Sequence, residues 1–138
     1  MRRAVIAALS AALILSGTAV AASFALGTYK GTTDQRGPMS MVIAKATMKS
    51  AKYGALFGCT DSSGKPTGTT QQMTTLPSAP IKHGKISQRY KLLRGSDLIL
   101  LSATLKGKTV TGFFQEAYES GSGHTCGTGG KIHFTLKH

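Results

Sequence analysis

From residue 28 to the C-terminus, apolar and polar residues alternate with a period of two, which is the pattern of half-buried β-strands. In the segment 52–60, Tyr53, Phe57 and Cys59 share one parity, and polar or small residues occupy most of the other positions. In 131–137 the apolar residues again occupy every second position. Each such run predicts a strand with one face in a core and one face in water.

Gly and Pro residues and Lys-Gly pairs separate these runs, as expected for tight turns. Apolar residues do not recur at helical spacing, so no helix is predicted after residue 28. The Ser-, Thr-, Gly- and Pro-rich segment 61–80 is predicted to be mostly irregular, with at most one edge strand at 71–75. The other predicted strands are 28–33, 39–46, 52–60, 86–92, 97–105, 109–118 and 131–137, with a short strand and tight turn at 81–85.

This pattern predicts one all-β domain over residues 28–138, preceded by a spacer at 22–27. Seven to eight short antiparallel strands fit either an antiparallel β-sandwich or a small β-barrel. The choice between these two architectures, and the order of the strands, stay open at this point.

The first 21 residues are predicted to be a signal peptide. Arg2 and Arg3 form a basic start, an apolar run follows, and Ala19-Val20-Ala21 is a typical cleavage signal. Cleavage is expected after Ala21 or Ala22. The apolar run is short for a transmembrane helix, so a retained signal anchor is the lesser alternative. We therefore expect a secreted or envelope-associated protein that does not span the membrane after processing.

Cys59 and Cys126 are the two cysteines of the chain. Because exported proteins meet an oxidising environment, these residues are predicted to form a disulfide. On the chain-entropy model, a bridge over so long a loop contributes roughly 4 kcal/mol to stability.

The formal net charge is +12, from 17 Lys and Arg residues against 5 Asp and Glu residues. So basic a protein attracts polyanions such as an anionic cell-wall polymer or an anionic surface. The alternative is that dispersed lysines keep the domain soluble and protect sheet edges. Arg94, Lys106 and Lys108 are expected in turns near the candidate face. The candidate polyanion-binding residues are Lys82, Lys85, Arg89, Lys91, Lys131, His133 and Lys137.

No arrangement of residues predicts catalysis, a metal site or a cofactor. Glu116 and Glu119 point to opposite faces of a regular strand, so they do not form an acid–base pair. Glu116 shares the parity of its apolar neighbours, which suggests a bulge, a barrel mouth or a lone functional carboxylate. His124 precedes a cysteine that the disulfide uses, and Gly107-Lys108-Thr109 reads as a turn. Sequence-specific DNA binding is not expected, because no helix is available for a groove.

Several short motifs follow one another along the domain. They are Tyr29-Lys30-Gly31-Thr32-Thr33 followed by Arg36-Gly37-Pro38, then Cys59-Thr60-Asp61, Ile81-Lys82-His83-Gly84-Lys85, Gly107-Lys108-Thr109-Val110-Thr111-Gly112, and Cys126-Gly127-Thr128-Gly129. In this order they resemble small secreted actinobacterial β-domain proteins without an established activity. The resemblance implies secretion, a β fold and a cysteine pair. The chain departs from that group at Gly130, which is extra, and at Phe134, where tryptophan is common.

We therefore expect a non-enzymatic, monomeric domain that binds or supports structure at the cell envelope. One alternative is a protein-binding inhibitor or adhesin that uses the 61–80 loop to contact a protein partner. Another is a small-molecule carrier, if the fold is an open barrel.

Overall fold

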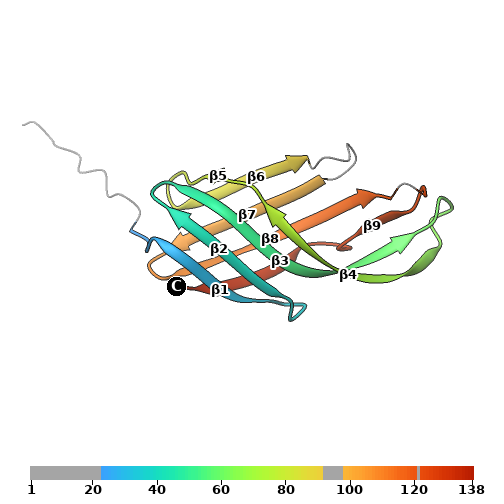
Figure 1. Cartoon of the computed structure of the whole chain (residues 1–138), viewed down its shortest axis with the longest axis horizontal. Helices are drawn as coiled ribbons and strands as arrows, with labels where there is room; N and C mark the ends of the chain where they lie inside the picture. Colours follow the sequence, from blue (N-terminus) through green and yellow to red (C-terminus); the bar gives the residue numbers. More distant parts are fainter. Residues whose placement is uncertain (1–22, 92–97, 121) are drawn as a thin grey trace, which may run out of the picture.

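The computed structural model describes residues 23–91, 98–120 and 122–138. Residues 1–22, on which the signal-peptide prediction falls, lie outside these ranges, as do Arg94 and parts of the predicted strands 86–92 and 97–105. The described part is all β (Figure 1). Its strands are β1 (Gly27–Thr33), β2 (Pro38–Ala44), β3 (Thr47–Thr60), β4 (Pro66–Leu76), β5 (Ala79–Pro80), β6 (Lys85–Lys91), β7 (Leu98–Lys106), β8 (Thr109–Glu119), β9 (Thr125–Gly127) and β10 (Ile132–Lys137).

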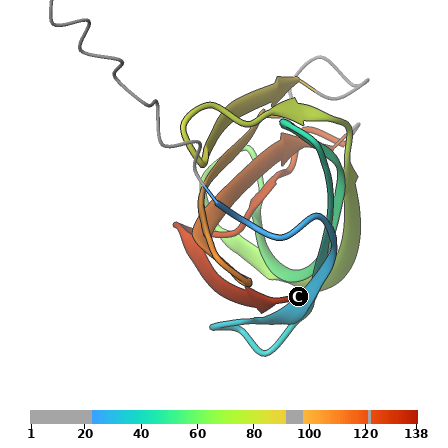
Figure 2. The same ribbon diagram turned by 90° about the vertical axis from the view of Figure 1, so that its left-hand side faces the viewer.

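Hydrogen bonds between antiparallel neighbours close six of these strands into a barrel. Around the ring the order is β10–β1–β2–β3–β9–β8, and β8 pairs again with β10. Figure 2 looks along the barrel from the end at which the C-terminus lies. Of the two predicted architectures, the small barrel is the one that the chain adopts. No helix long and apolar enough to span a bilayer occurs in the part of the chain that the structure describes.

The remaining strands extend the ring and share its core. β4 and β5 pair with β3, while β7 pairs with β8 and β6 with β7. The period-two pattern is confirmed in β10, where Ile132, Phe134 and Leu136 are buried between exposed residues. Burying one such side chain stabilises the fold by about 2 kcal/mol. The largest fully buried side chains are Tyr29, Tyr53, Phe57, Phe114, Met41, Ile43, Met48, Leu76, Ile86, Ile99, Leu101 and Leu136.

The disulfide lies where the ring closes. β9 is short, yet it pairs with β3 on one side and with β8 on the other. Cys59 and Cys126 are direct cross-strand partners, and they form the predicted bond with an S–S distance of 2.06 Å across 67 sequence positions. The bond therefore fixes the contact between β3 and β9 that completes the barrel.

The segment 61–80 is more regular than its composition predicts. In the turn before β4, the Asp61 carboxylate accepts hydrogen bonds from the backbone N–H groups of Ser63 and Lys65. An 11-residue strand, β4, then pairs with β3, and β5 follows it. The prediction of a long irregular loop is therefore wrong, because cross-strand pairing orders a polar sequence that has no apolar alternation. β9 is also a strand that was not predicted, so the described residues form ten strands where seven or eight were expected.

Candidate functional site

One end of the barrel is surrounded by lysines. It comprises the β2–β3, β5–β6 and β7–β8 turns, the end of β10, and the adjoining barrel wall as far as the middle of β1 and the first half of β3; the turns face the viewer in Figure 2. Backbone hydrogen bonds join these segments, since Leu105 N donates to Gly84 O at 2.7 Å and His138 N donates to Lys108 O at 2.9 Å. We call this surface the basic end and define it by exposed lysines. They are Lys30, Lys45, Lys49, Lys52, Lys82, Lys85, Lys106, Lys108 and Lys137.

The carboxylates lie elsewhere. Asp34 follows β1 at the opposite end of the barrel, Asp61 follows β3, and Glu119 ends β8. Glu116 is in the interior, with 5% of its surface exposed. Within the ranges that the structure describes, the basic end therefore contains no acidic side chain. Its ammonium groups repel one another and produce a positive field at this end of the molecule.

The structure brings together only some of the predicted polyanion-binding residues. Lys82 and Lys85 flank the β5–β6 turn, and Lys137 lies near the end of β10, so these three belong to the basic end. Arg89 and Lys91 are exposed on the second half of β6, away from the β5–β6 turn.

Of the other two predicted residues, His133 lies on β10 and Lys131 directly precedes it, and β7 and β8 separate this strand from β6. The Nζ atom of Lys131 lies 4.4 Å from the centre of the Phe113 ring, and the His133 ring lies 5.9 Å from the same ring. These two side chains therefore both lie against the Phe113 ring on the outer face of β8 and β10. The predicted set is divided between the basic end and two separate strands.

Sequence reasoning missed the contribution of Lys30, Lys45, Lys49 and Lys52 to the basic end. Their outward positions on strands or in a turn follow from the period-two pattern. Their gathering with lysines from β7 and β10 depends on which strands are neighbours, and the alternation does not reveal strand order.

Glu116 lies inside the barrel, in a hydrogen-bonded cluster. Its Oε2 atom accepts a hydrogen bond from the Tyr53 hydroxyl at 2.5 Å and another from the Thr74 hydroxyl at 3.0 Å. The Tyr53 ring stacks on Phe114, with ring centres 3.8 Å apart. Burial, and then the nearby carboxylate, raise the pKa of Tyr53 far above its ordinary value. Two hydroxyl groups donate hydrogen bonds to the buried Glu116 carboxylate, so we interpret this residue as a polar contact within the core.

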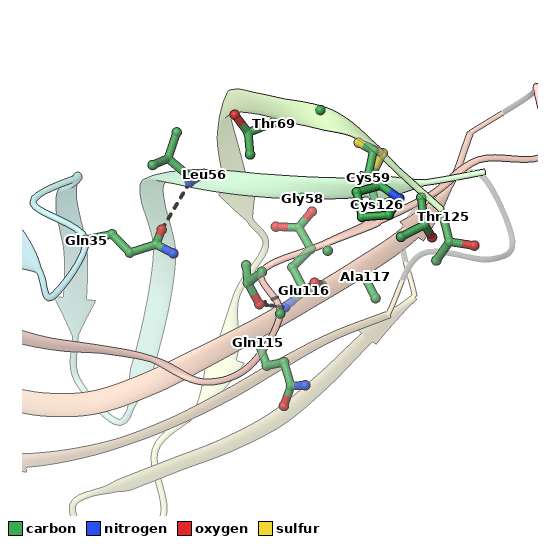
Figure 3. A pocket seen from close by; sticks show the side chains of 16 residues that line it. Gln35, Leu56, Gly58, Cys59, Thr69, Gln115, Glu116, Ala117, Thr125 and Cys126 are labelled. Atoms are coloured by element: carbon green, nitrogen blue, oxygen red, sulfur yellow. Dashed lines mark hydrogen bonds between the residues drawn. A yellow bond between two sulfur atoms is a disulfide. The ribbon is translucent and has the colours of Figure 1, made fainter. Parts of the chain in front are cut away.

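A shallow groove of about 730 Å³ lies on the outside of the barrel over β9 (Figure 3). It occurs where β3 extends beyond β2 and β8 extends beyond β10, so that β9 alone joins the two long strands. Gln35 bounds one side of the groove, and its side-chain oxygen accepts a hydrogen bond from Leu56 N at 3.1 Å. Thr128 closes the other, since its backbone N–H donates to Glu116 O at 2.9 Å. Glycines and the disulfide form much of the lining.

His124 lies in the segment between β8 and β9 and is partly buried. Among residues 23–91, 98–120 and 122–138, no group of three or more His, Cys, Asp or Glu side chains could hold a metal ion. Comparisons with known proteins found no matching family model, no matching curated protein and no matching solved structure. The site must therefore be interpreted from its own geometry and charge.

Proposed function

We propose that the protein is an exported, non-enzymatic binding domain that contacts an anionic polymer of the cell envelope through the basic end. The observation that carries this proposal is the uneven distribution of charge along the barrel. Exposed lysines from five strands and the intervening turns gather at the basic end, where no described acidic side chain lies. At the other end, the acidic side chains of Asp34 and Asp61 lie among basic ones such as Arg36 and Lys65. A polyanion bound at the basic end would replace repulsion between ammonium groups with attraction and release its own counterions.

The exported and non-enzymatic parts of the proposal rest on separate observations. The Cys59–Cys126 disulfide is compatible with an oxidising compartment, and the N-terminal sequence favours export. The one buried carboxylate of the described core, Glu116, is engaged with the Tyr53 and Thr74 hydroxyls. An interior filled by aromatic and methionine side chains does not favour a small-molecule carrier.

A salt titration tests the proposal. Poly(glycerol phosphate) serves as the probe, and we expect its affinity for the mature domain to fall steeply as salt increases. Replacing Lys106 and Lys137 by Gln should weaken binding, whereas replacing Arg89 and Lys91 by Gln removes the same charge from β6 and should weaken it less. Salt-independent binding, or a larger loss in the β6 variant, would contradict the proposed surface.

A protein partner is the second candidate, because one observation favours it. The first half of β4, from Pro66 to Thr69, is exposed although it is paired with β3. An extended, polar strand of this kind can contact another protein through its backbone and its threonine hydroxyls. Capture of a culture-supernatant protein that persists at high salt and is lost in a Thr67→Lys, Thr69→Lys variant would favour this function over polymer binding.

A further inference from the structure

The registers of adjacent strands place four lysines in one row across the barrel wall. Lys106 pairs with Thr109, Thr109 with Lys137, and Lys137 with Lys30. The row continues from Lys30 through Ser40 to Lys52. Five strand spacings separate its ends, or roughly 24 Å along the wall. Hydroxyl side chains on β8 and β2 occupy the positions between lysines. We call this set the lysine row: Lys106, Thr109, Lys137, Lys30, Ser40 and Lys52.

The direct pairing of Lys30 with Lys137 opposes folding, because like charges on opposite cross-strand positions repel. Protection of a sheet edge does not account for these side chains. β1, β3 and β10 each have hydrogen-bonded neighbours on both sides. Both ammonium groups remain exposed, and neither is cross-strand paired with an acidic side chain. The pair is therefore a position at which an added anion would relieve a repulsion already present.

A groove of about 360 Å³ lies on the same row. Lys30, Ser40 and Lys52 line it, so a hydroxyl lies between two ammonium-bearing side chains. Pro38 and Met73 form an apolar side of this groove, and Met73 is 54% exposed. Ammonium and hydroxyl groups donate hydrogen bonds to phosphate oxygens, and an apolar wall suits the carbon atoms between successive phosphates.

We infer that the lysine row is a binding site for a linear polymer of phosphate-linked units, which runs around the barrel wall across the strands. Successive phosphates contact successive members of the row, and one phosphate occupies the groove between Lys30 and Lys52. This inference rests on the proposed function and specifies its ligand. It differs from a general attraction to the basic end, because lysines in the turns of that end do not belong to the row.

The test compares two variants with the same net charge. The row variant carries Lys30→Gln, Lys52→Gln and Lys137→Gln, and the turn variant carries Lys45→Gln, Lys82→Gln and Lys108→Gln. All six lysines are exposed and belong to the basic end. The probes are labelled poly(glycerol phosphate) chains of increasing length, and binding is followed by fluorescence anisotropy at several salt concentrations. Thermal unfolding without ligand verifies that both variants are folded.

We expect the affinity of the original protein to increase with polymer length until the chain spans the row. The row variant should lose about tenfold in affinity for the long polymer, since each exposed contact contributes modestly. The slope of log affinity against log salt should fall by about 2, as expected when three phosphate contacts are lost. The turn variant should lose about threefold or less.

Different failures have different meanings. If the original protein binds no poly(glycerol phosphate), both the proposed function and this inference are wrong. If it binds but the two variants lose affinity equally, or if length has no effect, the polyanion surface stands and the row is overturned as a specific site. Vesicles of anionic phospholipid provide the remaining arm. A row variant that loses vesicle binding and keeps polymer binding would assign the row to a lipid surface and overturn the inference.

Discussion

Tyr53 makes two contacts in the interior. Its ring stacks on Phe114, and its O–H group donates a hydrogen bond to the Glu116 carboxylate. A buried carboxylate that loses a hydrogen-bond donor retains the cost of its desolvation. We predict that Tyr53→Phe lowers the free energy of unfolding by about 2 kcal/mol, as measured by urea denaturation. Tyr29→Phe is the matched control. Its hydroxyl donates to the carbonyl oxygen of Ala25 and should matter less, and an equal loss would contradict this account.

Ionisation of Tyr90 should lower the stability of the barrel at alkaline pH. Burial raises its pKa to about 12, from an ordinary value of 10.0, and its hydroxyl donates to Pro77 O at 3.1 Å. The folded state thus holds the proton more tightly than the unfolded state. The corresponding stability is complete below pH 10 and is lost as the pH rises from 10 to 12.

We therefore predict that the urea midpoint of the original protein declines over that range. The midpoint of Tyr90→Phe should decline less, because the variant has no phenol to ionise at this position. Tyrosinate absorbance recorded in the same samples reports the ionisation directly. A Tyr90→Phe curve parallel to that of the original protein would show that other groups control the decline.

The pairing of Lys30 with Lys137 predicts a change in the opposite direction. Removing one charge should relieve cross-strand repulsion and raise the free energy of unfolding by about 0.5 kcal/mol at low salt. We expect Lys137→Gln to show this gain and to lose it at high salt, where exposed charges are screened. Lys91→Gln is the control, because Lys91 pairs with Leu98. A destabilised Lys137→Gln protein would indicate that the side chain contributes through packing.

In strand β8, Gly112 lies so close to the backbone of β7 that there is no room for a side chain. A Cβ atom at Gly112 would lie 2.1 Å from Ser102 O and 2.8 Å from the Ala103 Cα atom, both on the neighbouring strand β7. Backbone atoms in a paired strand cannot move aside without breaking hydrogen bonds. We predict that Gly112→Ala costs about 2–3 kcal/mol in the free energy of unfolding. In β3, a Cβ atom at Gly58 would meet nothing within 4 Å, so Gly58→Ala should be neutral or slightly stabilising.

The faces of the strands were predictable, whereas their partners were not. Burial of Tyr53 and Phe57 on one face of β3 follows from alternation, which any half-buried strand requires. The edge strand allowed at 71–75 falls within β4, but the first half of β4 and the whole of β9 escaped prediction, because their order comes from pairing with β3 and not from an apolar pattern of their own. Barrel closure could not be deduced, because it requires the pairing of β8 with β10 and of β9 with both its neighbours.

In the candidate site, too, the exposure of side chains could be predicted and the pairing of strands could not. Exposure of Lys30, Lys52 and Lys137 was predictable from parity, and the strong positive charge was visible in the composition. Their alignment in one row depends on the registers of β10, β1, β2 and β3. A shift of one residue in any of these pairings would turn a lysine toward the core. The sequence therefore predicted an anionic ligand and left the location of the proposed site open.

In the whole barrel, the two ends have different physical roles. The basic end gathers charges that repel one another, and the other end contains β9 and the disulfide that complete the ring. The disulfide is thus distant from the surface that we propose for binding, and the lysines of that surface are exposed and not part of the core. This separation allows lysines of the basic end to be replaced without removing a core contact, so binding variants should remain folded.

The disulfide provides the last test of this arrangement. Replacing both Cys59 and Cys126 by Ala releases a loop of 67 positions and should cost roughly 4 kcal/mol, mostly by enlarging the unfolded ensemble. Because β9 is held by only short pairings with β3 and β8, amide hydrogen exchange should accelerate there more than in β1 and β2. Polymer affinity at the basic end should be unchanged at temperatures where the variant is folded. Uniform acceleration of exchange across all strands would mean that β9 is not a separate unit and that the barrel opens only as a whole.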